Sequence, residues 1–220
     1  KHNGPVKNLT KFEKILGIKY FRNKIKFSTS PSLEAQIASI SDDIAYNSHD
    51  LEDGLKSNLF NLSDLKNIPI LNKIVLKHTK KIKNYSIDLV IRQIVREIIN
   101  EMVKDLIITT QKNIKKNKVK NLNDVLKSKY PLVSFSNKMR KFDKKIKKFL
   151  RKNMYYHKNV KSNTNQGKII IKKLFLSIKK NPNKYLNVSK YDKTNIARSI
   201  CDFIAGMTDR YAINLYKRIK

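Results

Sequence analysis

A chain of 220 residues is long enough for one domain with a sizeable buried core or for two small domains. Only five glycines and five prolines are present, which disfavours folds made of many short strands, and the single cysteine, Cys201, excludes an internal disulfide or a cysteine-based zinc site supplied by this chain alone. The 49 Lys and Arg against 17 Asp and Glu give a net charge of +32, which fits either phosphate-bearing partners or a lysine-rich drift in composition.

The hydrophobic pattern predicts a series of helices and no confident strand. After a mixed stretch over residues 1–31, Ser32, with Gln36 near the capping-box position, predicts a helix from Leu33 to about Phe60. Apolar pairs then recur every four residues from 90/91 to 106/107, which predicts a long helix over 86–111 with one broad buried stripe. Further helices are expected over residues 136–157, 167–180 and 192–218. We therefore expect an all-α chain.

Five of the 17 acidic residues lie between Asp42 and Asp53, inside the first of these helices. A projection at 100° per residue gathers six apolar side chains on one face: Leu33, Ile37, Ile40, Ile44, Leu51 and Leu55. The opposite face carries a set that we call the acidic arc: Asp42, Tyr46, His49, Asp50 and Asp53. Such a stripe is usually a solvated face, but a chain this basic would be expected to place lysine there, and the arc has none. Its carboxylates and phenol suit either a divalent metal or sugar hydroxyls.

The stretch around the arc, SPSLEAQIASISDDIAYNSHDLEDGL, resembles the helix that carries the last metal-binding Asp of deoxyguanosine triphosphate triphosphohydrolase-like proteins, a branch of the HD-domain superfamily. Three other stretches resemble that family in the same order along the chain: KHNGP at residues 1–5, FLRKNMYYH at 149–157 and CDFIAGMTDRYA at 201–212. The resemblance implies the C-terminal part of an HD-domain helical fold. We expect residues 1–112 to form the remainder of the HD core and residues 113–220 a helical region packed on it, as one continuous unit.

The resemblance also implies an activity, the hydrolysis of a deoxynucleoside triphosphate to the deoxynucleoside and inorganic triphosphate with Mg²⁺ or Mn²⁺. By position, Asp42 corresponds to the last metal ligand of the family. Tyr46 and Asp50 correspond to residues that face the deoxyribose, Lys147 to a phosphate contact and Tyr155 to the tyrosine on the sugar side. The binding partners expected are therefore deoxynucleoside triphosphates.

The family's metal motif is H…HD…D, and its first members have no counterpart before Asp42. The only His-Asp pair, His49-Asp50, follows Asp42 and lies in the stretch assigned to the substrate. We therefore expect an incomplete C-terminal piece that carries no catalytic residue beyond this metal ligand and is inactive by itself. In the last motif, Gly206 is expected to pack closely against a neighbouring helix as part of a buried structural element, and Cys201 is expected in the core.

Two rival functions stay open on the sequence alone. One is a basic helical protein that binds nucleic acid without sequence specificity, and the other is an inactive relative that serves as an assembly subunit. The family resemblance also implies a homo-oligomer. No run approaches the ~18 apolar residues that span a bilayer, and no signal-like segment is seen, so we expect a cytoplasmic protein without membrane contact.

Overall fold

The computed structural model describes residues 29–80, 85–186 and 195–219. Every regular element in these residues is a helix or a helical turn, which confirms the all-α prediction. The chain divides into two compact units, Lys1–Met154 and Tyr155–Lys220, and the division expected at residue 112 stays a prediction. The KHNGP motif and the mixed stretch before residue 29 lie outside the described residues. None of the described helices is long and apolar enough to cross a membrane.

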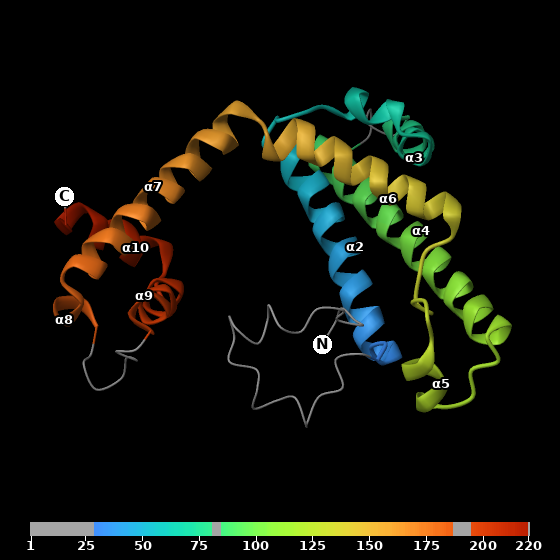
Figure 1. Ribbon diagram of the computed structural model, residues 1–220. Helices are drawn as coiled ribbons and strands as arrows, with labels where there is room; N and C mark the ends of the chain where they lie inside the picture. Colours follow the sequence, from blue (N-terminus) through green and yellow to red (C-terminus); the bar gives the residue numbers. More distant parts are fainter. Residues whose placement is uncertain (1–28, 81–84, 187–194, 220) are drawn as a thin grey trace. The chain divides into compact units, whose positions relative to one another are not determined.

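The first unit is built on three long helices, α2 (Leu33–Lys56), α4 (Ile87–Lys116) and α6 (Asn137–Leu150). Helix α2 packs against both α4 and α6, so these helices lie side by side in Figure 1. The shorter elements are η2 (Leu62–Asn67), α3 (Pro69–Thr79), which packs on α4, and α5 (Leu122–Lys127). One hydrophobic core joins the unit, with contributions from α2, α3, α4 and α6.

Helix α4 confirms the predicted apolar stripe. The Ser86 hydroxyl accepts a hydrogen bond from Leu89 N, which caps the helix at the expected start. Both members of the first two apolar pairs are buried, whereas only the first member of the later pairs is buried, and Ile107 is exposed. The reason is geometric, because a residue adjacent to a buried one is turned by 100° and leaves the core as the stripe narrows.

Helix α2 starts where its capping signal predicts and ends earlier than expected. The Ser32 hydroxyl accepts from Ala35 N, and the helix closes at Lys56, four residues short of Phe60. On the predicted apolar face Ile44, Leu51 and Leu55 are buried, but Ile37 is 46% exposed, so that assignment was wrong. The polar residues Gln36, Asn47 and Ser48 are buried instead. The face of α2 that meets its neighbours is therefore partly polar.

The second unit contains α7 (Lys158–Lys180), α8 (Pro182–Tyr185), α9 (Ile196–Ala205) and α10 (Asp209–Ile219). Helix α7 packs against both α9 and α10 over a small core, whose buried residues are Leu174, Ile178, Leu186 and Ile200. A π-helical turn, η4 (Arg151–Tyr155), precedes α7. Because α7 begins at Lys158, the polar stretch KSNTNQG is helical, although the sequence predicted helices only before residue 158 and from residue 167.

The predicted helix over 192–218 is two helices. Gly206 is the C-cap of α9, and the Thr208 hydroxyl accepts from Tyr211 N at the start of α10. Gly206 is exposed, and a Cβ there would meet only backbone oxygens 3.6 Å away, so close packing against another helix was a wrong prediction. Cys201 is exposed as well, which corrects its expected place in the core. The motif GMTDRYA thus contains the turn between α9 and α10, at residues 206–208, and the first turn of α10.

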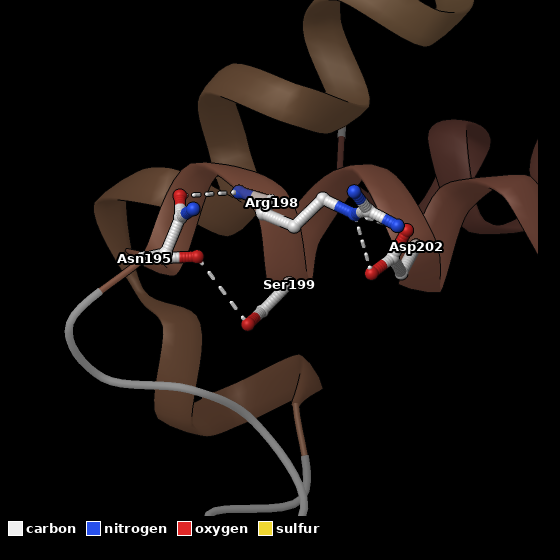
Figure 2. Close-up of polar contacts among 4 residues, drawn as sticks. All are labelled: Asn195, Arg198, Ser199 and Asp202. Carbon is white, nitrogen blue, oxygen red and sulfur yellow. Dashed lines mark hydrogen bonds and ion pairs between the residues drawn. The ribbon is translucent and has the colours of Figure 1, made fainter. Parts of the chain in front are cut away.

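Figure 2 shows how α9 begins. The Asn195 Oδ1 accepts from Arg198 N at 3.3 Å, and the Arg198 Nε donates to both carboxylate oxygens of Asp202 at 2.8 Å, one turn further on. Hydrogen bonding to Asp202 and its charge raise the pKa of the Arg198 guanidinium. Both side chains are solvent-exposed, so this i,i+4 pair supports the helix only weakly.

Candidate functional site

The acidic arc lies on the outer surface of α2 within the first unit. Asp42, His49 and Asp53 are exposed, Tyr46 is 64% exposed, and Asp50 is partly buried. The buried residues of the same helix lie on its other side and face α4 and α6. The structure therefore keeps the arc on one side of one helix, as the spacing predicts. The roles assigned to its residues remain predictions.

Asp42 is the candidate metal ligand on this surface. The part of the chain that the structure describes holds no group of three His, Cys, Asp or Glu side chains arranged to bind a metal ion. One exposed carboxylate does not make a divalent-metal site, because Mg²⁺ and Mn²⁺ sites take several oxygen ligands. The described residues thus do not complete a site for the expected metal by themselves.

Lys147 reaches α2 from α6 beside the acidic arc. Its Nζ lies 3.1 Å from Oδ2 of Asp43, the residue next to Asp42, and 3.1 Å from Oδ2 of Asp143, one turn earlier on α6. The phosphate-contact candidate and the metal-ligand candidate are therefore brought to the same part of the surface. We call this set of contacts between the two helices the α2–α6 crossing.

A buried hydrogen bond holds the α2–α6 crossing from the inside. Asn47 Nδ2 donates to Asp143 Oδ1 over 2.9 Å, and both residues are buried. A hydrogen bond to a charged acceptor contributes about 1.5–3 kcal/mol, and the buried carboxylate would be costly without it. The Lys147–Asp43 pair is half-exposed and contributes about 0–1 kcal/mol. The inner contact is thus the stronger of the two.

The two carboxylates keep Lys147 charged. Partial burial lowers the pKa of the Lys147 ammonium, but the hydrogen bonds and charges of Asp143 and Asp43 outweigh it and raise the pKa above its ordinary value of 10.5. The group is a permanent cation near neutral pH. It can therefore bind an anion without first gaining a proton.

Sequence reasoning missed Asn47 and Asp143, although a signal for Asp143 was present. In the stretch NKMRKFDKKIKKFL, Asp143 occurs at the same helical spacing as the buried Met139, Phe142, Ile146 and Leu150. A carboxylate on the apolar stripe of a basic helix needs a partner, and the cations one turn away are Arg140 and Lys147. Asn47 gave no comparable signal, because polar residues are frequent on α2.

The start of α6 is fixed by two other helices, which places Lys147. The Asp105 carboxylate of α4 accepts from Ser136 N at 2.8 Å and from Ser136 Oγ at 2.6 Å. The Gln36 side chain of α2 accepts from Leu132 N at 2.9 Å and from Val133 N at 3.0 Å in the loop that leads to α6. The helix that carries Lys147 is thus tied at its entry and at its middle.

Tyr155 belongs to the second unit and ends the turn η4. Its side chain is 46% exposed. His157 occupies the N-cap position of α7. Of the five predicted site residues, the structure therefore gathers Asp42, Tyr46, Asp50 and Lys147 on the first unit.

A second polar cluster, which the sequence did not indicate, joins α3 to α4. Glu97 on α4 binds His78 Nε2 and, at 2.8 Å, Lys77 Nζ, both on α3. Burial raises the pKa of the Glu97 carboxyl, but hydrogen bonds and charges from Lys77 and His78 outweigh it and hold the pKa below its ordinary value of 4.5. Lys77 and Glu97 also line a pocket of about 650 Å³.

Comparison with known proteins gives a family match and several relatives. Residues 133–218 match the family model HD_assoc, the phosphohydrolase-associated domain. The chain is 50% identical, over 219 residues, to a protein of Pelagibacter ubique (strain HTCC1062) named deoxyguanosinetriphosphate triphosphohydrolase-like protein. It is 37% and 34% identical to proteins of the same name from Bartonella quintana (strain Toulouse) and Neorickettsia sennetsu (strain ATCC VR-367 / Miyayama).

These matches extend over 99–100% of this chain and over 57–59% of the length of the three relatives. The chain thus spans a little more than half of each relative that it matches. The matched stretch extends over both compact units. The chain belongs to the family of deoxyguanosinetriphosphate triphosphohydrolase-like proteins.

Proposed function

We propose that this chain forms the substrate-facing part of an enzyme that hydrolyses a deoxynucleoside triphosphate, dGTP or a similar nucleotide, to the deoxynucleoside and inorganic triphosphate. The observation that supports this most directly is the position of Lys147, whose ammonium lies beside Asp43 at the edge of the acidic arc. A cation for phosphates and carboxylates for a sugar and a metal thus occur within a short distance on one surface. The names of the relatives support the same reaction.

In this proposal Lys147 binds the phosphates. The triphosphate of the substrate carries several negative charges. When it binds, these charges lose part of their hydration, and fixed cations of the protein must compensate for that loss. Lys147 is charged near neutral pH and is directed to α2 by its two carboxylate partners. It orients the triphosphate along α2.

Tyr46 and Asp50 recognise the deoxyribose of the substrate. They lie one turn apart on the same side of α2, and each is at least partly exposed. The Asp50 carboxylate accepts a hydrogen bond from the 3′-hydroxyl, and the Tyr46 ring packs beside C2′ and leaves no room for a 2′-hydroxyl. Tyr155 contributes a second aromatic ring to the sugar side.

Asp42 is proposed as one ligand of a divalent metal ion, Mg²⁺ or Mn²⁺. Such an ion supplies Lewis acidity toward a phosphoryl oxygen and a more acidic bound water. Because the described residues do not complete a metal site, we assign no reaction step to the ion. The role of Asp42 is limited to supplying negative charge at the end of the arc nearest Lys147.

The test is dGTP hydrolysis by the protein at the full length of its relatives, with Asp42→Ala as the variant. We expect activity to be lost while the circular dichroism spectrum and the unfolding midpoint are kept, because Asp42 is exposed and the core face of α2 is untouched. Glu101→Ala, which removes an exposed carboxylate from α4, is the matched control and should keep its activity. Substantial activity in Asp42→Ala would overturn the assignment.

A second function, nonspecific binding of nucleic acid, is favoured by one observation. The exposed side of α6 consists of Asn137 and six basic residues, Lys138, Arg140, Lys141, Lys144, Lys145 and Lys148. A row of this kind can follow a phosphate backbone. Such binding would weaken steeply with salt and ignore base identity, so a salt titration with single-stranded and double-stranded DNA separates it from binding of one nucleotide.

A further inference from the structure

The Lys147 ammonium has two carboxylate partners of different character. Asp143 and Asp43 both lie 3.1 Å from Nζ, but the Asp143 side chain is 12% exposed and the Asp43 side chain 56% exposed. Asp143 also accepts the buried hydrogen bond from Asn47. One partner is therefore fixed inside the first unit, and the other approaches from the solvent side.

The two partners differ in how easily an anion can replace them. Moving Asp143 away from Lys147 would leave a buried carboxylate without its cation, which proteins tolerate poorly. Moving Asp43 away only returns an exposed carboxylate to water, and exposed ion pairs contribute little to stability. A phosphoryl oxygen offers an ammonium the same charge-assisted hydrogen bond that a carboxylate oxygen offers. An arriving phosphate can therefore exchange with Asp43 but not with Asp143.

We propose that Asn47 and Asp143 are positioning residues for Lys147, and that Asp43 occupies the place of a phosphoryl group on Lys147 until a triphosphate replaces it. Asp43 is then a built-in competitor that lowers the affinity for triphosphate and keeps the ammonium in place while no substrate is bound. The inference rests on the proposed function for the identity of the anion. It assigns roles to three residues for which the sequence predicted none.

A static salt bridge between α2 and α6 would make a different prediction. If Asp43 only joins the helices, its removal changes anion binding no more than the loss of any other exposed carboxylate. If Asp43 competes with phosphate, its removal increases affinity, and the increase depends on Lys147. The two cases are separated by a double-mutant cycle.

The experiment measures binding of inorganic triphosphate to the 220-residue chain by titration calorimetry at fixed ionic strength. Asp43→Asn should tighten binding about two- to fivefold, the range set by an exposed ion pair. Glu101→Gln removes the same charge from an exposed site on α4 and should change affinity less. In a Lys147→Ala background, Asp43→Asn should increase the affinity for triphosphate no more than Glu101→Gln does. Lys144→Ala, on the exposed side of the same helix, is the control for Lys147→Ala.

The positioning residues are tested with variants that leave the net charge unchanged. Asn47→Ala removes the amide that fixes Asp143 and should weaken triphosphate binding about two- to fivefold, with Asn47→Ser as a second variant if the first does not fold. Lys147→Arg, which keeps the cation and its reach, should retain most of the affinity. A merely structural Asn47 would lower the unfolding midpoint and leave triphosphate binding unchanged.

Either of two results would overturn the inference. In the first, Asp43→Asn binds triphosphate no more tightly than Glu101→Gln does. In the second, the gain in triphosphate affinity from Asp43→Asn persists in the Lys147→Ala background. Asp43 is exposed, so this cycle decides the question even if no Asn47 variant folds. The proposed function fails separately. If triphosphate binding follows the expected double-mutant cycle but the full-length protein does not hydrolyse dGTP, the proposed enzyme function is refuted and this inference stands. If the full-length protein hydrolyses dGTP but the cycle is absent, this inference is refuted and the proposed function stands.

Discussion

The Phe60 ring fills the space where a side chain at Gly54 would begin. A Cβ on Gly54 would lie 2.2 Å from Phe60 Cε1, although real Cβ atoms essentially never come closer than 3.0 Å to another heavy atom. Phe60 is buried and packs edge-on against Phe149 of α6, with ring centroids 4.9 Å apart. The glycine near the end of α2 thus lets the chain return across its own helix and meet α6.

Gly54→Ala is therefore expected to destabilise the first unit. The added methyl must displace a buried aromatic ring, and overpacking of this kind costs about 1–3 kcal/mol, more than the helix propensity gained. The measurement is the urea-unfolding midpoint followed by circular dichroism. Gly167→Ala is the matched control, because a Cβ there meets nothing within 4 Å in the middle of α7, and it should be neutral or stabilising. A Gly54→Ala protein as stable as the wild type would contradict the packing argument.

The isolated 220-residue chain should bind Mn²⁺ weakly and release no triphosphate from any deoxynucleoside triphosphate. The physical reason is that the described residues hold no group of three His, Cys, Asp or Glu side chains that could bind a metal ion, and a divalent cation needs several ligands. Titration calorimetry with Mn²⁺ and an assay for released inorganic triphosphate and deoxynucleoside make the measurement, with a metal-free sample as the control. Turnover well above that control, in a preparation free of host enzyme, would mean that a metal site forms within this chain.

Asp50→Ala should weaken use of dGTP at full length by roughly tenfold or more in kcat/KM, because a hydrogen bond to a charged acceptor is lost. The same change should leave 2′,3′-dideoxy-GTP almost unaffected, since that substrate has no 3′-hydroxyl to bind. The dideoxy substrate is thus the control within the experiment. Equal losses on both substrates would show that Asp50 has a structural role only.

Tyr46→Ala should reduce the preference for dGTP over GTP. Removal of the ring opens space beside C2′, so the 2′-hydroxyl of GTP is no longer excluded, and the ratio of the two kcat/KM values should fall. Tyr46→Phe, which keeps the ring, should preserve the ratio. An unchanged ratio in Tyr46→Ala would remove the ring from sugar recognition.

The contacts of Glu97 with Lys77 and His78 make the stability of the first unit depend on pH. Because the pKa of Glu97 in the folded chain lies below 4.5, its contribution to stability is present above that value and is lost as the pH falls through the folded pKa. The difference in unfolding free energy between wild type and Glu97→Gln should shrink as the pH falls below 4.5. Glu101→Gln is the control on the same helix. A difference that does not change between about pH 5 and pH 3 would contradict this account.

The sequence predicted the helices best where periodicity and caps agree. Ser32 and Ser86 start α2 and α4 at the predicted residues, and the apolar stripe of α4 is buried as expected. The errors occur where local signals are weak or ambiguous. The polar stretch before Gly167 has helical neighbours and continues α7, and Gly206 ends a helix that its pattern seemed to extend.

For the candidate site, the sequence predicted which residues of α2 share one side of the helix, but not the hydrogen bonds and ion pairs that join α2 to α6. The spacing of Asp42, Tyr46 and Asp50 on α2 indicated a shared side, and the structure keeps them there. The contact of Lys147 with Asp43 joins residues 104 positions apart, and no single-sequence pattern carries such a pairing. Asn47 was missed for the same reason, since its partner on α6 lies 96 residues away.

The ties on α6 have a consequence for its rotational setting. Asp105 holds Ser136 at the start of the helix, Gln36 holds the loop before it, and Asn47 holds Asp143 two turns later. One residue inserted between Ser136 and Asp143 would turn everything beyond it by about 100° about the helix axis, and Lys147 would face away from α2. The composition and charge of the chain would hardly change, yet the Lys147 ammonium would no longer lie beside the acidic arc. The rotation of α6 about its own axis thus decides whether Lys147, one of many lysines in this chain, contacts α2.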